Sequence, residues 1–149
     1  MDAHAPDEGH TDYCVLVSVP RLRRLCDPFA YPPWEDIARL TIDGVRQAMQ
    51  EGFVLAQAYS GAHRVSAWST DQHLARIAYL AQHGWSEPID VDVGVPHMGC
   101  VVEWPVLDGN HRLAAAIVRG DTHILASVSG CEDTMRRRLG RLLRPKSPT

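Results

Sequence analysis

One run in this sequence, residues 106–116, constrains the fold more than any other segment. A strand-like segment, residues 103–107, meets the turn pair Asp108-Gly109, and a helix-like segment follows at once. Gly109 meets a backbone requirement at such a turn, which is either a positive φ or the close approach of a ligand. The run therefore predicts a strand–turn–helix unit whose helix begins directly after the glycine.

The side chains around that helix start predict a site for a negatively charged ligand. Backbone N–H groups at a helix N-terminus have no intrahelical acceptor, and the helix dipole is positive there. Arg112 adds a forked, charged donor, and His111 can donate or shuttle a proton. We expect Asn110 to cap the helix, whereas Asp108 could be a general base, a Mg²⁺ ligand or only the first turn residue. Phosphate is the expected anion.

Composition indicates one globular domain. The chain has 149 residues, 45% of them hydrophobic, and no apolar run approaches the ~18 residues of a membrane span. Residues 1–12 are polar and acidic, and they predict a disordered tail rather than a signal peptide, so a cytoplasmic location is expected. The expected domain covers residues 13–131. The four cysteines form no CxxC pair and lack zinc-finger spacing, so we expect free thiols.

Residues 132–149 predict a basic amphipathic helix and tail, although the formal net charge of the chain is -3. The arginines of this segment include Arg136, Arg137, Arg138, Arg141 and Arg144. A smaller basic group consists of Arg21, Arg23 and Arg24. The C-terminal arginines could follow the phosphates of a nucleic acid. The interpretation that we favour is a solvated helix face, whose apolar side packs on the core or on a second copy of the chain.

Apolar periodicity predicts an α+β fold without internal repeats. Strands are expected at residues 13–19, 88–95, 101–107 and 122–128, and helices at residues 34–51, 69–83, 111–119 and 132–143. Strands 88–95 and 101–107 are expected to pair as a hairpin. Ser69 and Gln72 form a capping-box pattern, and Gly84 is expected to end that helix.

Other segments leave the prediction open. Pro20 is expected to end the first strand, and the helical segment 34–51 could be two short helices with a break at Gly44. Residues 53–58 fit either a strand or a helix end, and residues 59–68 fit a loop or short hairpin. We expect the tryptophans to pack in the core or at its rim rather than to stack on a base. They are Trp34, Trp68, Trp85 and Trp104.

Residues 69–130 resemble the ParB/sulfiredoxin superfamily, and three pieces in the same order carry the resemblance. The first is a capped helix that ends at Gly84 and leads into Pro88-Ile89-Asp90-Val91. The second is the strand and turn ending in Asp108-Gly109-Asn110-His111-Arg112, which is similar to the superfamily's phosphate-binding signature. The third is the small-residue helix 113–120 with a short strand after it. The resemblance implies a compact ParB/sulfiredoxin-like fold, with a small mixed sheet flanked by helices.

Members of this superfamily share phosphate binding at this turn. They include CTP-binding partition proteins, sulfiredoxins, a free serine kinase, and ParB-like phage and plasmid proteins with ATPase or nuclease activity. Sulfiredoxins place a nucleophilic cysteine where this chain has Asn110, so sulfiredoxin chemistry is not expected. Partition proteins usually have Arg-Arg at His111-Arg112 and continue into a helix-turn-helix domain, for which this chain ends too soon. The kinase and the small ParB-like proteins are the nearest in pattern.

The resemblance implies a nucleotide site at the turn, with ATP or CTP and Mg²⁺ as the expected ligands. Gly109, Asn110 and His111 would offer backbone donors to the phosphates. Arg112 would neutralise the charge of the transferring group. Asp108 would act as the base or hold the metal ion.

Two residues of the preceding helix, His73 and Arg76, complete the expected site, because that helix borders the nucleotide in the superfamily. A solvated helix face is the alternative for both. The main hypothesis is thus an NTP-binding protein that acts as an NTPase or phosphotransferase.

Two other functions stay open. The chain could be a plasmid- or phage-type DNA-associated protein or a ParB-like nuclease that binds DNA through Arg136, Arg137, Arg138 and Arg141. It could also be a module without catalysis that uses the pocket for protein interaction. No membrane partner is expected, and a homodimer is left open.

Overall fold

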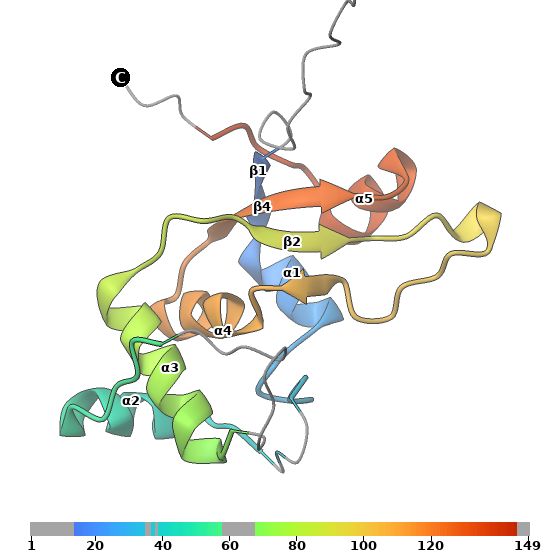
Figure 1. Ribbon diagram of the computed structural model, residues 1–149. Coiled ribbons are helices and arrows are strands. Elements are labelled where there is room, and N and C mark those ends of the chain that lie inside the picture. The colour runs from blue at the N-terminus through green and yellow to red at the C-terminus, as the bar shows by residue number, and fades with distance from the viewer. Residues whose placement is uncertain (1–13, 35–36, 38, 58–67, 146–149) are drawn as a thin grey trace, which may run out of the picture.

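The computed structural model describes residues 14–34, 37, 39–57 and 68–145, and in these residues four strands form one mixed sheet. The strands are β1 (Cys14–Ser18), β2 (Ile89–Asp92), β3 (Val106–Asp108) and β4 (His123–Ser129). Their order across the sheet is β1-β4-β2-β3 (Figure 1). β4 pairs antiparallel with β1 and parallel with β2, while β2 pairs antiparallel with β3. The prediction of an α+β fold with a small mixed sheet is confirmed.

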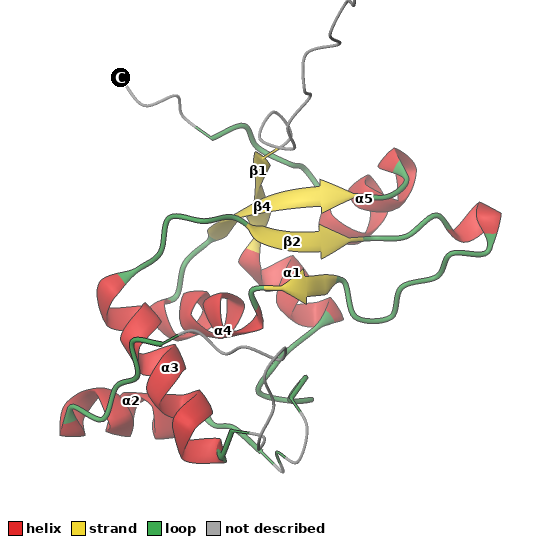
Figure 2. Ribbon diagram, in the orientation of Figure 1, coloured by secondary structure: helices red, strands yellow, loops and turns green. Residues whose placement is uncertain are grey.

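Five α-helices accompany the sheet in the described part of the chain (Figure 2). They are α1 (Val19–Leu25), α2 (Ile42–Glu51), α3 (Thr70–His83), α4 (Asn110–Arg119) and α5 (Glu132–Leu139). α4 lies between the sheet and the α2–α3 pair (Figure 1). None of the described helices is long and apolar enough to cross a membrane.

α4 belongs to two hydrophobic cores at once, and this fixes its position. Leu113 and Ala116 pack in a core with the sheet, α1 and α5. Ala114 and Ala115 pack in a second core with α2 and α3. Burial of a leucine such as Leu113 contributes roughly 2 kcal/mol, and the small alanines let α3 approach α4 closely. The two cores together hold the start of α4 at the edge of the sheet.

The prediction that Pro20 simply ends the first strand missed a helix. β1 ends at Ser18, and Pro20 lies in the first turn of α1. Proline suits that position because its missing N–H would have no acceptor there. The hydroxyl of Ser18 accepts a hydrogen bond from the backbone N–H of Arg21 at 3.4 Å and caps the helix.

In the predicted helix over residues 34–51, the described residues before Ile42 (34, 37 and 39–41) are not helical. Regular helix begins only at Ile42, where the Thr41 hydroxyl accepts a hydrogen bond from the Gly44 N–H at 2.9 Å. Gly44 does not break the helix. Its missing side chain leaves room for Leu74 of α3, whose Cδ1 would lie 3.2 Å from a Cβ at this position.

Residues 53–57 form neither the strand nor the helix end that was predicted there, while residue 58 lies outside the described residues. The predicted loop or hairpin at 59–68 falls outside them too, except for Trp68. The predicted disordered tail, residues 1–12, lies outside them as well.

The predicted hairpin is confirmed, but both of its strands are shorter than expected. β2 and β3 pair with a register shift between Asp90 and Val91. The chain between the two strands leaves the sheet through a single turn of 3-10 helix, Pro96–Met98. A bridge from Val95 to Cys100 closes that turn.

One predicted helix start and two predicted helix ends are confirmed by their capping residues. Ser69 and Gln72 form the capping box of α3, and Gly84 ends that helix. Gly120 ends α4. The last helix is shorter than predicted, because α5 ends at Gly140 and Leu143 forms a bridge to Leu16 instead.

Candidate functional site

The turn between β3 and α4 requires glycine. Gly109 has φ = 103°, a value in the left-handed region that disfavours residues with a Cβ. A Cβ at this position would also lie 2.7 Å from the Cβ of Ile89 and would contact its Cγ2 more closely still. The sequence left two explanations for Gly109, a positive φ or the close approach of a ligand, and the positive φ is confirmed.

Asn110 is not the helix cap that the sequence predicts. Gly109 occupies the cap position, Asn110 is the first helical residue, and no described side chain caps α4. The Asn110 Oδ1 atom accepts a hydrogen bond from the indole N–H of Trp104 at 2.9 Å. Its Nδ2 atom donates to the backbone carbonyl of Val106 at 3.3 Å. Asn110 therefore ties the helix start to the β2–β3 hairpin, and a carboxamide is needed because it both accepts and donates.

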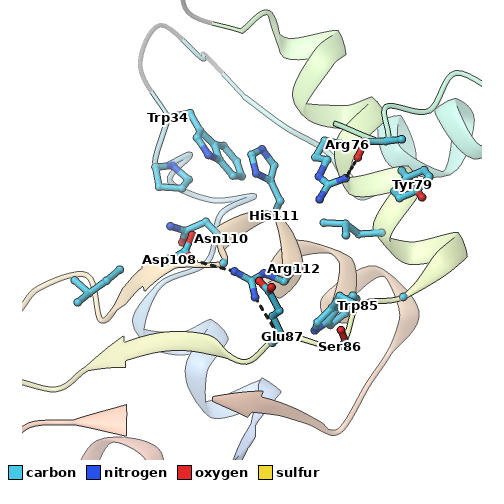
Figure 3. Close-up of a pocket in the computed structure, with 16 residues that line it drawn as sticks. Trp34, Arg76, Tyr79, Trp85, Ser86, Glu87, Asp108, Asn110, His111 and Arg112 are labelled. Carbon is cyan, nitrogen blue, oxygen red and sulfur yellow. Dashed lines mark hydrogen bonds and ion pairs between the residues drawn. The ribbon is translucent and has the colours of Figure 1, made fainter. Parts of the chain in front are cut away.

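Arg112 is held by acceptors from two directions. Its Nη1 atom donates to the carbonyl oxygens of Glu87 at 3.0 Å and Pro88 at 2.9 Å. Its Nη2 atom donates to Asp108 Oδ2 at 3.1 Å (Figure 3). The Arg112 side chain is only 14% exposed, whereas that of Asp108 is 72% exposed. These contacts offset the unfavourable placement of a cation at a helix N-terminus, and they clamp the segment before β2 to α4.

A cavity of about 620 Å³ opens at the start of α4. Its size falls in the range of roughly 300–1,000 Å³ that small-molecule sites occupy. The turn and the start of α4 form one wall, and Figure 3 shows Trp34, Arg76, Tyr79 and Trp85 around the same space. Of the residues predicted for the site, this cavity brings together Arg76, Asp108, Gly109, Asn110, His111 and Arg112.

Arg76 reaches the cavity from α3. Its Nη1 atom donates to the carbonyl oxygen of Ala56 at 2.7 Å, and its guanidinium carbon lies 5.6 Å from the ring centre of Tyr79. Burial lowers the pKa of Arg76, and the positive charge of Arg112 adds to this lowering while Tyr79 opposes it. Two cations thus approach each other at one cavity, an arrangement that a bound anion stabilises.

His73 and His111 form a hydrogen-bonded pair between α3 and α4. The distance from His73 Nδ1 to His111 Nε2 is 2.8 Å. Trp34 stacks on both rings, with centroid distances of 4.6 Å and 4.3 Å. Trp68 is tilted against the same two rings. The expected direct contact of His73 with a ligand is not supported, because the residue is 1% exposed and lies outside the cavity lining.

Both imidazoles are disposed to stay neutral. Burial lowers the pKa of His73 from 6.5 to about 4. Burial, and then the neighbouring His73, Arg76 and Arg112, hold the pKa of His111 well below its ordinary value. In this structure His111 therefore presents a neutral ring to the cavity at neutral pH.

Comparison with known proteins finds no matching family model, no matching curated protein and no matching solved structure. The function is therefore inferred from the geometry of the cavity. Several of its lining residues, among them Trp34, Trp85 and Glu87, were not predicted as site residues. Their sequence positions carry no motif. Trp34 stacks on His73 and His111 beside the turn, and Trp85 and Glu87 lie in the segment between α3 and β2.

The carboxylates of the cavity suit a magnesium ion that binds together with phosphate. Asp108, the predicted metal ligand, and Glu87 both line the cavity. In the described part of the chain no group of three or more His, Cys, Asp or Glu residues is placed to hold a metal ion. Mg²⁺ commonly binds one or two carboxylates and completes its shell with phosphate oxygens and water. The residues present fit that mode of binding.

Proposed function

We propose that this chain binds a nucleoside triphosphate, ATP or CTP, in the cavity at the start of α4. The observation that carries the proposal is the cavity of about 620 Å³ into which a helix start without a side-chain cap and two arginines converge. The backbone N–H groups of Asn110 and His111 would donate to phosphate oxygens. A phosphorylated ligand would accept hydrogen bonds from these donors, and its negative charge would offset the repulsion between the Arg76 and Arg112 guanidinium groups.

Arg76 and Arg112 would both neutralise negative charge on the phosphates of the ligand. Three hydrogen bonds from Arg112 to protein oxygens fix its guanidinium, so it would act as a preorganised charge. Arg76 makes its strongest contact with one carbonyl and is supported by Tyr79. A guanidinium has five N–H donors, so both arginines retain donors for a ligand.

The aromatic side chains of the cavity would stack on the nucleotide base. Trp34 forms one side and Trp85 another, and a flat heteroaromatic ring gains from stacking on such faces (Figure 3). Arg119 lies over the ring of Trp85, 4.9 Å from its centre, and occupies one face of it. Base stacking by tryptophan is a departure from the packing role that the sequence predicts for these residues.

Phosphoryl transfer or NTP hydrolysis is the reaction that we propose for the site. Mg²⁺ would supply charge neutralisation on the phosphates, with Asp108 and Glu87 as its protein ligands. As the alternative to holding the metal ion, Asp108, which is the exposed carboxylate beside the turn, would accept a proton from an attacking hydroxyl or water. Arg112 orients that carboxylate through the 3.1 Å contact.

The proposed ParB/sulfiredoxin-like fold is supported by the order of the elements. The capped helix α3, strand β2, the β3–turn–α4 unit and β4 follow one another as the resemblance requires. β2 lies between β3 and β4, so the turn at Gly109 packs against Ile89 of β2. This contact joins the two sequence pieces on which the resemblance depends.

Calorimetric titration of the full chain with ATP, CTP, ADP, pyrophosphate, adenosine and cytidine, with and without Mg²⁺, tests the binding. We expect the triphosphates to bind and the nucleosides adenosine and cytidine to give no signal. Arg76→Gln should weaken triphosphate binding by about tenfold, the loss of about 1.4 kcal/mol from one charged contact. Arg46→Gln, on the exposed side of α2, is the matched control and should leave binding unchanged.

Failure of every nucleotide to bind would overturn the proposal, and so would equal binding by wild type and Arg76→Gln. Thermal unfolding of Arg76→Gln must be compared with wild type, because Arg76 also contacts the Ala56 carbonyl. Arg76→Lys retains the charge and should recover part of the affinity. Release of phosphate from ATP or CTP, measured for wild type and Asp108→Asn, then tests the reaction.

A further inference from the structure

A second positively charged surface lies on α1 and α5. The last helix and the chain after it carry exposed arginines, and so does α1, which packs on α5. We call these residues the α1–α5 basic surface, and they are Arg21, Arg24, Arg136, Arg137, Arg141 and Arg144. In the described part of the chain, ion pairs involve other arginines: Arg23, Arg46, Arg112 and Arg119.

Arg21 joins the two helices of this surface. A Cβ on Gly140 would lie 2.7 Å from the Arg21 Nε atom and 2.9 Å from its Cζ atom, so the guanidinium lies directly over the end of α5. Arg136 and Arg141 line a groove of about 560 Å³ that includes Gly140. Arg21, Arg136 and Arg141 are therefore gathered around one point of the surface, although Arg21 is far from the other two in sequence.

Two features of α5 refine the earlier expectation. Leu139 is buried and Met135 packs against the core, so the apolar side of the helix docks on the core as expected. Arg138 does not belong to the exposed face, because its Nη1 atom donates to the carbonyl oxygen of Val102 at 2.9 Å. The exposed arginines of α1 lie on the same surface as those of α5 and the chain after it, although the two groups are far apart in the sequence.

We propose that the α1–α5 basic surface binds the phosphodiester backbone of a nucleic acid. Six exposed guanidinium groups exceed what one small anion can neutralise, so their partner is a polyanion. Guanidinium groups match phosphate oxygens through paired N–H donors, and the described part of this surface carries arginine without lysine. The acidic residue on the groove wall is Glu132, which lies at the opposite end of α5 from Gly140.

A nucleic acid fits this surface better than a lipid membrane does. Surfaces that lie on membranes insert large apolar side chains beside their cations. The exposed large hydrophobic residues of the described chain lie elsewhere, at Tyr31, Phe53, Met98, Val101 and Leu107. The apolar side chains of the groove, Met135 and Leu142, are partly buried against the core and do not project as membrane anchors. The basic surface therefore has the charge for a polyanion without the apolar anchors of a membrane-binding face.

Fluorescence anisotropy with a labelled DNA duplex and with one of its single strands, at several salt concentrations, tests the proposal. We expect the logarithm of the affinity to fall linearly with the logarithm of salt concentration. The double variant R136Q/R141Q should reduce that slope on duplex DNA by about 2, since each phosphate contact contributes about 0.9. The double variant R39Q/R46Q removes the same charge from another exposed region and should leave the slope unchanged.

Arg21→Gln tests whether the arginines of α1 and those of α5 belong to one binding surface. If α1 and α5 form one site, this single change should reduce the slope by about 1. Arg76→Gln, in the nucleotide cavity, should not alter the binding of DNA, so the two proposals stand or fall separately. Circular dichroism of each variant should match wild type, because the six side chains are exposed.

Three results would overturn the proposal. One is the absence of DNA binding at low salt, and another is an equal effect of R39Q/R46Q and R136Q/R141Q. The third is equal or stronger binding to polyglutamate or to vesicles of anionic lipid, which would assign the surface to an acidic protein or a membrane.

Discussion

His73 Nδ1 and His111 Nε2 lie 2.8 Å apart, so a hydrogen bond between these side chains joins α3 to the start of α4. Such a bond needs one N–H group and one lone pair, which two neutral imidazoles provide. Trp34 covers both rings and also lines the cavity. The state of the histidine pair is therefore linked to the wall of the proposed nucleotide site.

We expect the free energy of unfolding to decrease as the pH falls from about 6.5 to about 4. Burial lowers the pKa of His73 to about 4, and the pKa of His111 is also held below its ordinary value. The unfolded chain has ordinary imidazoles with pKa near 6.5, so in this window it binds protons that the folded state does not. The contribution of His73 is present above pH 6.5, and on the order of 3 kcal/mol is lost by pH 4.

Urea unfolding at a series of pH values measures this dependence. His97→Gln, which replaces an exposed histidine of the β2–β3 hairpin, should keep the wild-type profile. A free energy of unfolding that stays constant between neutral pH and pH 4 would contradict the expectation.

Gly109→Ala should destabilise the fold strongly. Alanine would be strained at φ = 103°, and its Cβ would collide with Ile89. Strain and overpacking together should cost about 3 kcal/mol or more in the free energy of unfolding. Gly120→Ala is the matched control, since that glycine also has a positive φ but has open space around it, and its cost should be about 1 kcal/mol. Equal losses in the two variants would show that the contact with Ile89 is unimportant.

Asn110→Ala should cost about 1–3 kcal/mol, because it leaves the indole N–H of Trp104 and the carbonyl of Val106 without this partner. Asn110→Asp keeps the acceptor for Trp104 and loses the donor to Val106, so its stability should lie between those of Asn110→Ala and wild type. Thermal unfolding followed by circular dichroism ranks the three proteins. An alanine variant as stable as wild type would mean that the hairpin does not need this anchor.

Arg112→Gln should lose more stability than Asp108→Asn, although the two residues contact each other. Arg112 is mostly buried and also holds the Glu87 and Pro88 carbonyls, so its loss should cost roughly 2–4 kcal/mol. Asp108 is largely exposed, so removing its charge should cost less than about 1 kcal/mol. Chemical denaturation of both variants makes the comparison. Equal losses would indicate that the ion pair, and not the carbonyl contacts, fixes Arg112.

The sequence by itself determined the elements whose signals are local. The capping box of Ser69, the glycines at 84 and 120, and the strand–turn–helix unit at Gly109 all predict structure correctly. Each of these signals acts within one turn of helix or between adjacent residues, where a few side chains decide the backbone conformation.

Only the tertiary structure decided which side chains from distant parts of the sequence come into contact. β4 enters the sheet between β1 and β2, His73 contacts His111 across 38 positions of sequence, and Arg112 donates to the carbonyl of Glu87. Arg21 comes to lie over Gly140 in the same way. The contacts of His111 and Arg112 arise because α4 is buried between two cores, and Arg21 meets Gly140 because α1 packs on α5. The packing of whole elements, which no local pattern encodes, sets which side chains face each other.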